Sequence, residues 1–126
     1  MTAFLDTNIV IALLSPEDHF HAWAVQSVTS HKADGPVIVS DIVYCEASVA
    51  MNSREEMDEA IARLGLERTG CSDEALFRAG KAFKKYRDEN KGQKLGVLPD
   101  FIIGAIADTE GIPLLTTNAK DFTGYL

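Results

Sequence analysis

Three short apolar runs, each followed at once by polar residues, constrain the fold of this chain most. The runs 3–5, 36–39 and 114–116 have the length and composition of strands, and the stretches between them carry apolar residues at helical spacing. A weaker strand candidate lies at 66–69. Strands that alternate with helices in this way are typical of one α/β domain.

The chain is long enough for one hydrophobic core and too short for two. Its 126 residues are 46% hydrophobic, which predicts a single domain over residues 1–126. No segment approaches the roughly 20 apolar residues that span a bilayer. The stretch 1–15 has no basic residue ahead of its apolar part, so it does not resemble a signal peptide. We therefore expect a cytoplasmic protein without a membrane partner.

Helix starts can be read from capping residues. Ser40, Ser53 and Ser72 each precede a helical pattern and are predicted caps. Another helix is predicted to begin at 15–18, where a capping hydroxyl, a proline at the first position and acids in the first turn follow one another. Four residues at helical spacing would form the core face of that helix. They are Phe20, Trp23, Ala24 and Val28.

Two acids stand at helix starts, one near each end of the chain. Asp6 closes the first strand, and the carboxyl ends of strands are the edge where open α/β sheets bind ligands. Asp100 follows Pro99 in the first turn of a helix whose next residues, 101–107, are apolar nearly all round. Taken alone, Asp6 could be a helix cap, and Asp100 could complement a helix dipole.

Glu46 is harder to explain as a structural residue. In the segment 41–51, at about 100° per residue, Glu46 falls on one arc with Ile42, Val49 and Ala50. A carboxylate among apolar side chains would cost several kcal/mol without a partner. Only a chance salt bridge would give it a structural role, so we expect Glu46 to meet a cation.

Polar residues also follow the last strand. Asn118 could be an ordinary helix cap and Asp121 an ordinary first-turn acid. The strand ends at Leu5 and Thr116 and the starts of two helices can, however, converge on one crevice. Several acids at such a crevice suit Mg²⁺, which takes oxygen ligands. The arrangement indicates a metal-dependent nuclease.

The charge of the chain argues against a general nucleic-acid binder, with one exception. The formal net charge is −7, whereas such proteins carry a basic surface. Between 81 and 94, however, six basic residues outnumber two acids, which predicts either a phosphate-contacting rim beside the acidic centre or merely the solvated face of a helix. The six are Lys81, Lys84, Lys85, Arg87, Lys91 and Lys94. The buried stripe of that helix would be Leu76, Ala79, Phe83 and Tyr86.

The cysteines and histidines give no sign of a second site. Cys45 and Cys71 are 26 positions apart (71 minus 45) with no neighbouring Cys to form a zinc pair, and we expect buried thiols. His19, His21 and His31 have no recognisable ligand spacing and are predicted to lie on the surface. A metal-free ribonuclease with His as acid and base is therefore disfavoured.

The polar motifs, taken in order, resemble the PIN domain and, within it, VapC-type toxins of bacterial toxin–antitoxin systems. The motifs are L-D-T-N at 5–8, Glu46 after the second strand, L-P-D at 98–100 and T-T-N-A-K-D-F at 116–122. The resemblance implies a Rossmann-like parallel sheet flanked by helices. It also implies a Mg²⁺- or Mn²⁺-dependent ribonuclease, usually a homodimer, that a cognate VapB-type antitoxin inhibits. Transfer RNA is the substrate class that the resemblance favours, and operator DNA would be reached only through the antitoxin.

The resemblance also assigns roles to residues. Asp6, Glu46 and Asp100 match the three central acids of the family. Asp6 and Asp100 would bind the metal directly, and Glu46 would bind it or hold its water. Many relatives have Asp where this chain has Asn118, so either Asn118 or Asp121 would complete the site. The divalent ion would activate a water for attack on the phosphodiester and stabilise the developing charge.

Two other classes remain open at this point. A response-regulator receiver domain has a similar length and an acidic Mg²⁺ pocket, but it needs a phosphoacceptor Asp at a strand end near mid-chain. This sequence has the helical pattern R-E-E-M-D-E-A-I-A-R-L there, at 54–64. A PIN-like module without catalytic activity is the second alternative, and the presence of all three central acids argues against it.

Overall fold

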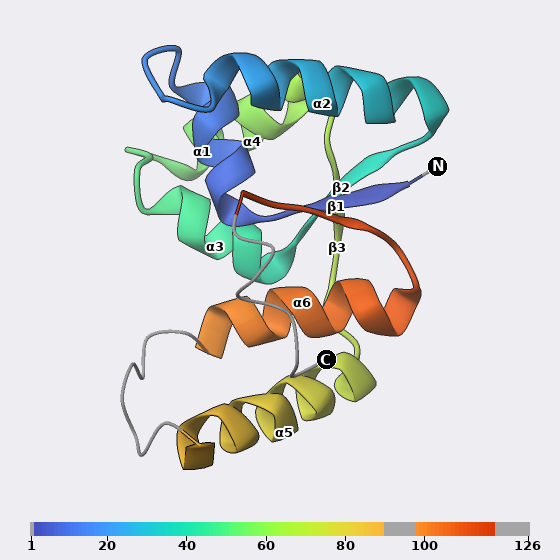
Figure 1. Cartoon of the computed structure of the whole chain (residues 1–126). Helices are drawn as coiled ribbons and strands as arrows, with labels where there is room; N and C mark the ends of the chain where they lie inside the picture. Colours follow the sequence, from blue (N-terminus) through green and yellow to red (C-terminus); the bar gives the residue numbers. More distant parts are fainter. Residues whose placement is uncertain (1, 90–97, 118–126) are drawn as a thin grey trace.

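The computed structural model describes residues 2–89 and 98–117 and shows an α/β fold (Figure 1). Four strands form one parallel sheet in the order β3-β2-β1-β4. The strands are β1 (Ala3–Leu5), β2 (Val37–Ser40), β3 (Glu67–Thr69) and β4 (Leu114–Leu115). The helices are α1 (Thr7–Leu14), α2 (His21–Asp34), α3 (Asp41–Ser48), α4 (Arg54–Leu64), α5 (Asp73–Glu89) and α6 (Leu98–Glu110).

Strand β1 lies inside the sheet and is buried on both faces. Phe4 pairs with Ile38 of β2 on one side and with Leu114 of β4 on the other. All three residues of β1 are buried, as expected for a parallel strand covered by helices on both faces. The carboxyl end of β1 therefore lies beside those of β2 and β4, and these three strand ends define the edge where the polar residues follow.

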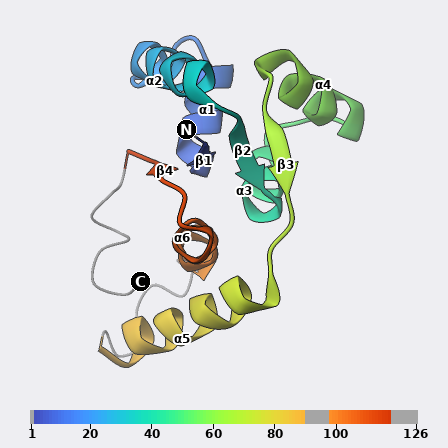
Figure 2. The ribbon, with the colours of Figure 1, turned by 90° about the vertical axis from the view of Figure 1, so that its right-hand side faces the viewer.

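Helices cover both faces of the sheet, and on one face they form two layers. On one face Leu5, Ile9 and Val10 belong to a core that α1, α2, α3 and α4 enclose. On the other face α6 lies between the sheet and α5 (Figure 2), so it packs on two sides. This position explains why α6 is apolar nearly all round, as the sequence predicts. Among the described residues, no helix is both long enough and apolar enough to cross a membrane.

The predicted caps are confirmed. Ser40 Oγ accepts from the Val43 amide, Ser53 Oγ from the Glu56 amide and Ser72 Oγ from the Ala75 amide. Gly65 ends α4 in the left-handed region, with φ of 66°, which favours glycine. Because capping depends on residues close in sequence, it is the part of the fold that the sequence predicts best.

The predicted start of the second helix is wrong. Residues 15–18 form turns, and α2 begins at His21. Asp18 accepts from the Phe20 amide at 2.8 Å, and His21 Nδ1 lies 2.7 Å from the Ala12 carbonyl oxygen. The helix therefore begins later in the sequence than expected, so different residues face the core. As a consequence Phe20 and Trp23 are 43% and 42% exposed, and of the expected core face only Ala24 and Val28 are buried.

Two further expectations about buried faces are wrong in part, since Ala79 is buried and Phe83 and Tyr86 pack against Phe101 as expected. Helix α3 ends at Ser48, after which amides bond three residues back, so Val49 is 88% exposed and Ala50 is exposed too. Helix α5 packs through Ala75, Ala79 and Ala82, which turns Leu76 to the outside at 40% exposure. Both errors arise because a helical wheel assumes that the helix continues and does not show which side of it packs against the rest of the protein.

The expectation of buried thiols is wrong for Cys45 and half right for Cys71. Cys45 is exposed, because α3 turns Val43 and Ala47 to the core instead. Cys71 is half-buried, and burial raises the pKa of its thiol. Of the histidines, His19 is exposed, whereas His21 and His31 are half-buried.

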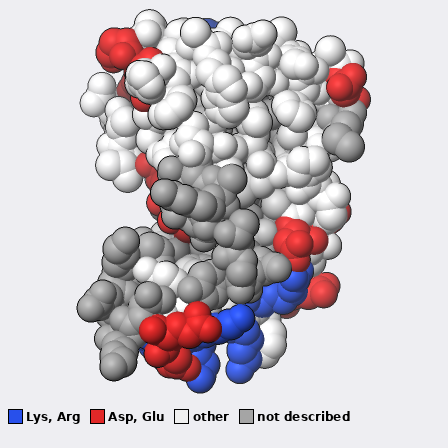
Figure 3. Space-filling view, viewed as in Figure 1, with Lys and Arg blue, Asp and Glu red and all other residues white. Residues whose placement is uncertain are grey.

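Charge is unevenly distributed over the surface. On the face shown in Figure 3, Lys and Arg side chains gather at the lower end, where α5 lies. The net charge of the whole chain is −7. Helix α5 carries five basic and four acidic residues, so the Lys and Arg side chains stand beside acids at this end of the molecule.

Candidate metal centre

Asp6 is fixed where β1 ends and α1 begins. Its Oδ1 accepts from the Thr7 amide at 2.8 Å and its Oδ2 from the Thr116 hydroxyl at 2.7 Å. Its own amide donates to the Leu115 carbonyl at 3.0 Å. These bonds tie Asp6 to the carboxyl end of β4 as well as to that of β1, and the residue is only 4% exposed.

Thr7 joins Asp6 to Glu46. The Thr7 hydroxyl donates to Glu46 Oε1 at 2.7 Å, across 39 positions of sequence. Glu46 stands in α3, which follows β2, the neighbour of β1 in the sheet. The strand order therefore brings Asp6, at the β1–α1 junction, close to Glu46, which lies in the second turn of α3.

Among the described residues, the hydrogen-bond partners of these two carboxylates are neutral. Within residues 2–89 and 98–117, the four ion pairs are Arg54–Asp58, Arg68–Asp41, Arg78–Asp108 and Lys84–Asp88, and none includes Asp6 or Glu46. The chance salt bridge that would give Glu46 a structural role is thus not found among these residues. A buried carboxylate without a cation is costly, which is the condition that a bound metal ion would relieve.

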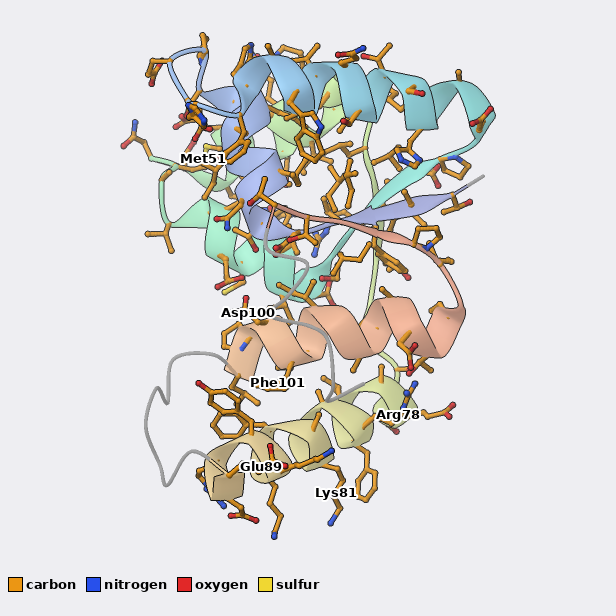
Figure 4. All side chains as sticks on the ribbon, viewed as in Figure 1. Met51, Arg78, Lys81, Glu89, Asp100 and Phe101 are labelled. Atoms are coloured by element: carbon orange, nitrogen blue, oxygen red, sulfur yellow. The ribbon has the colours of Figure 1, made fainter. Side chains whose placement is uncertain are left out.

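Asp100 stands in the first turn of α6 and is half-buried. Figure 4 shows it on the side of α6 that faces α3, whereas the next residue, Phe101, lies on the side that faces α5. The Phe101 ring packs against those of Phe83 and Tyr86, with centroids 5.9 and 5.4 Å away. This aromatic packing sets the rotation of α6 and, with it, the direction of Asp100.

The structure groups the predicted site residues only in part. It links Asp6 and Glu46 through Thr7, and it places Asp100 at the start of α6 on the side that faces α3. Across the described ranges, no three carboxylate, imidazole or thiol groups lie close enough to enclose a metal ion. Asn118 and Asp121 fall outside the described residues.

The donor set nevertheless fits a hard divalent cation. Mg²⁺ keeps several waters and is commonly held by one or two carboxylates together with substrate phosphate. Asp6 and Glu46 provide two carboxylates, with hydroxyl groups of Thr7 and Thr116 holding them in place. Such hydrogen bonds to ligands set their orientation.

Thr7 and Thr116 are the residues that sequence reasoning missed as parts of the site. Each is adjacent to a motif that the sequence singles out, Thr7 in L-D-T-N and Thr116 at the end of the last strand. Their hydroxyls bond to acids 39 and 110 positions away. A hydroxyl beside an acid at a strand end is a usable signal, but only the fold reveals its partner.

Comparison with known proteins agrees with this architecture. A family profile described as the PIN domain matches residues 3–125. No protein with a curated description matches the chain in sequence.

Solved structures match over nearly the whole chain. VapBC2 from Rickettsia felis, bound to a DNA fragment from their promoter, gives a TM-score of 0.71 at 22% identity and covers 95% of this chain and 90% of its own. VapBC-1 from nontypeable Haemophilus influenzae gives 0.68 at 24%, covering 97% and 90%. VapC20 from Mycobacterium tuberculosis, described as a Sarcin-Ricin loop cleaving toxin, gives 0.65 at 18%, covering 98% and 96%. At these identities the similarity is one of fold.

Proposed function

Because the chain belongs to the PIN-domain family, we propose that it is a metal-dependent endoribonuclease and the toxin of a toxin–antitoxin pair. The observation that carries the proposal is the pair of acids at the sheet edge. Asp6 and Glu46 share Thr7 as a hydrogen-bond partner and have no basic partner among the described residues. Such a pair is suited to a hard cation, and Asp6 also caps α1.

In this proposal each acid has a role in holding Mg²⁺ or Mn²⁺. Asp6 and Asp100 act as ligands, and Glu46 acts as a ligand or holds a water of the ion. Thr116 keeps Asp6 in one rotamer, and Thr7 does the same for Glu46. Either Asn118 or Asp121 completes the site. When bound, the ion supplies an activated water and stabilises the charge that develops on the phosphodiester.

The charges of the acidic site and of α5, rather than the shape of a binding groove, support RNA as the substrate. An acidic site repels phosphate until a divalent cation occupies it. The basic residues of α5 then add a second attraction for an RNA backbone on the helix that packs against α6, which bears Asp100. Transfer RNA is the substrate class that we test first.

An antitoxin partner is supported by a groove between α1 and α4, of about 400 Å³. Six of its lining residues are apolar, and Ser15, two acids and one Arg also line it. This combination fits an amphipathic helix with basic residues at its edges. The apolar lining residues are Ile11, Leu14, Ala47, Ala50, Met51 and Ala60, and the polar ones are Ser15, Glu56, Glu59 and Arg63.

The structural neighbours support the same partner. VapBC2, VapBC-1 and the FitAB structures are complexes, and two of them were solved with DNA. We propose that this chain likewise pairs with a VapB-type antitoxin, forms a homodimer, reaches operator DNA only through the antitoxin and works in the cytoplasm.

The test is cleavage of total transfer RNA by purified, antitoxin-free protein in Mn²⁺ or Mg²⁺. Asp100→Asn should abolish cleavage, and so should EDTA. Glu17→Gln, which alters an exposed acid distant in sequence from the site, should cleave like the wild type. Discrete fragments that disappear in EDTA and in Asp100→Asn would support the proposal.

Three results would contradict it. Full activity in EDTA that a His substitution abolishes would indicate metal-free chemistry. Divalent-ion binding without cleavage of transfer, messenger or ribosomal RNA would indicate a catalytically inactive PIN-like module. Uptake of phosphate from acetyl phosphate would indicate a receiver-type signalling domain.

A further inference from the structure

The outward face of α5 carries an aromatic ring that contributes nothing to the core. Phe77 is 67% exposed, although α5 buries Ala75, Ala79 and Ala82 against its neighbours. Exposing so much of a Phe side chain gives up apolar burial, which is commonly worth about 1.5–3 kcal/mol. A single exposed apolar side chain is normal, so the residues around Phe77 decide whether it has a role.

Lysines share this face with Phe77. At 3.6 residues per turn, Phe77, Lys81 and Lys84 form one stripe on the side of α5 opposite Ala79. Lys81 Nζ lies 5.4 Å from the Phe77 ring centroid, and Figure 4 shows Lys81 projecting away from α6. Lys84 bonds to Asp88 at 2.9 Å in an exposed pair, which contributes little stability and can exchange for another anion.

Gly80, which has no side chain, lies beside this stripe on the exposed side of α5. A Cβ at this position would meet no atom within 4 Å, so no packing contact among the described residues requires a glycine here. A glycine inside a helix costs about 1 kcal/mol relative to alanine. Its position, three residues after Phe77 and four before Lys84, leaves backbone accessible between the ring and the ammonium group.

Local charge indicates what kind of partner fits. Helix α5 contains five basic residues and four acids, a net charge of +1, on a chain whose total is −7. Arg78 is engaged with Asp108 and Thr109, whereas Lys81 and Lys84 lie on the exposed side. An exposed aromatic ring interleaved with lysines is the combination with which proteins hold single-stranded nucleic acid.

We propose that Phe77, Gly80, Lys81 and Lys84 form a subsite for a single-stranded RNA segment that flanks the cleaved bond. A base stacks on Phe77 over the gap at Gly80, and the two lysines contact phosphates. The proposal rests on the ribonuclease function proposed above. The stripe spans about 10 Å along the helix axis from Phe77 to Lys84.

The subsite lies on the side of α5 that faces away from α6, so an RNA strand must pass round the end of α5 to reach the acidic centre. Figure 4 places Glu89, at the end of α5, and Asp100, at the start of α6, at the same end of this helix pair. An RNA strand that leaves Lys84 toward the end of α5 therefore approaches the helix start that bears Asp100. This arrangement would add affinity outside the reacting phosphodiester.

The experiment measures binding of a labelled, unstructured oligoribonucleotide to full-length Asp100→Asn protein, which holds RNA without cutting it. Adding Phe77→Ala should weaken binding about tenfold, the effect expected for losing one stacked base. Phe77→Trp should bind like the parent, whereas Phe77→Leu, which stays apolar, should bind like Phe77→Ala. Leu76→Ala, at a neighbouring exposed apolar position, is the matched control and should change nothing.

The contribution of the lysines is measured by the salt dependence of RNA binding. Lys81→Gln and Lys84→Gln should each reduce the slope of log affinity against log salt by about 0.7, the value for one phosphate contact on a single strand. Asp88→Asn should strengthen binding, because it releases Lys84 from its ion pair.

Several outcomes would overturn the subsite. Phe77→Leu binding as tightly as Phe77→Trp would exclude stacking. Phe77 variants that weaken association with a second protein chain but leave RNA binding unchanged would identify a protein interface instead. If wild-type protein cleaves RNA while all α5 variants bind normally, the subsite is wrong and the ribonuclease function stands. If wild-type protein neither binds nor cleaves RNA, both proposals are wrong.

Discussion

Thr7 is the residue on which the geometry of the acidic pair depends. Its amide donates to Asp6 and its hydroxyl to Glu46. Thr7→Val keeps the shape of the side chain and removes only the hydroxyl, so Glu46 loses its hydrogen-bond partner. We expect RNA cleavage to fall about 10- to 100-fold, as is common when a partner of a metal ligand is removed.

Rescue distinguishes this positioning role from a general effect on folding. Thr7→Ser retains the hydroxyl and should restore most of the cleavage rate, whereas Thr29→Val, at an exposed position of α2, should leave the rate unchanged. Equal rates for Thr7→Val and the wild type would show that the hydrogen bond to Glu46 has no part in catalysis.

A second residue pair couples stability to pH. The Tyr44 hydroxyl donates to Asp58 at 2.5 Å, which raises the pKa of Tyr44 and lowers that of Asp58. The carboxyl therefore stabilises the fold above its unfolded pKa of about 3.9 and loses this effect as pH falls through the lower folded value. The phenol stabilises the fold below about pH 10 and loses its effect as pH rises through its raised pKa.

Tyr44→Phe keeps the ring beneath Arg68, whose guanidinium carbon lies 3.8 Å from the ring centroid, and removes only the hydroxyl. We expect a lower melting temperature than the wild type at pH 7 and a difference that narrows below about pH 4, where Asp58 becomes protonated in both proteins. Thermal unfolding at pH 3, 5 and 7 measures this. A pH-independent difference, or none at pH 7, would contradict the linkage.

Among the elements, α4 shows how much a short motif determines. Ser53 caps the helix by accepting from the Glu56 amide, and the Glu56 carboxylate accepts from the Asn52 amide. Ser53→Ala should lower the free energy of unfolding by about 1 kcal/mol. Urea denaturation should show a lower midpoint with an unchanged slope, and Ser30→Ala on the exposed side of α2 should show neither change.

The helices and strands also show which features of the fold sequence patterns could not predict. Strands and caps were predictable because an apolar run and a serine act locally. The start of α2 was not, because Asp18 closes a turn with Phe20 and leaves 15–18 outside the helix. The segment 54–64, expected to be helical, is α4, so no strand-end acid occurs there for a receiver-type phosphoacceptor.

At the scale of the whole molecule, strand order decides which polar residues meet. Asp6 and Glu46 could be selected from sequence because each contradicts its apolar surroundings. Their connection through Thr7, and that of Asp6 to Thr116, could not be predicted, because it depends on β1 lying between β2 and β4. Asn118 and Asp121 lie outside the described residues and stay predictions.

Binding of a divalent cation by this acidic pair is the most direct test of the proposed site. We would measure the melting temperature of wild-type protein and Asp6→Asn with and without Mn²⁺. At 100 times the dissociation constant, binding to the folded state adds about 2.7 kcal/mol, which for a chain of this size raises the melting temperature by roughly 10 °C.

The wild type should show this rise, and Glu17→Gln, the exposed control, should show it too. Asp6→Asn should be at least as stable as the wild type without metal, because it removes a buried carboxylate, and should gain nothing from Mn²⁺. Adding Mn²⁺ should therefore make the wild type the more stable of the two proteins. An equal Mn²⁺ response in wild type and Asp6→Asn would show that Asp6 is not part of a metal site.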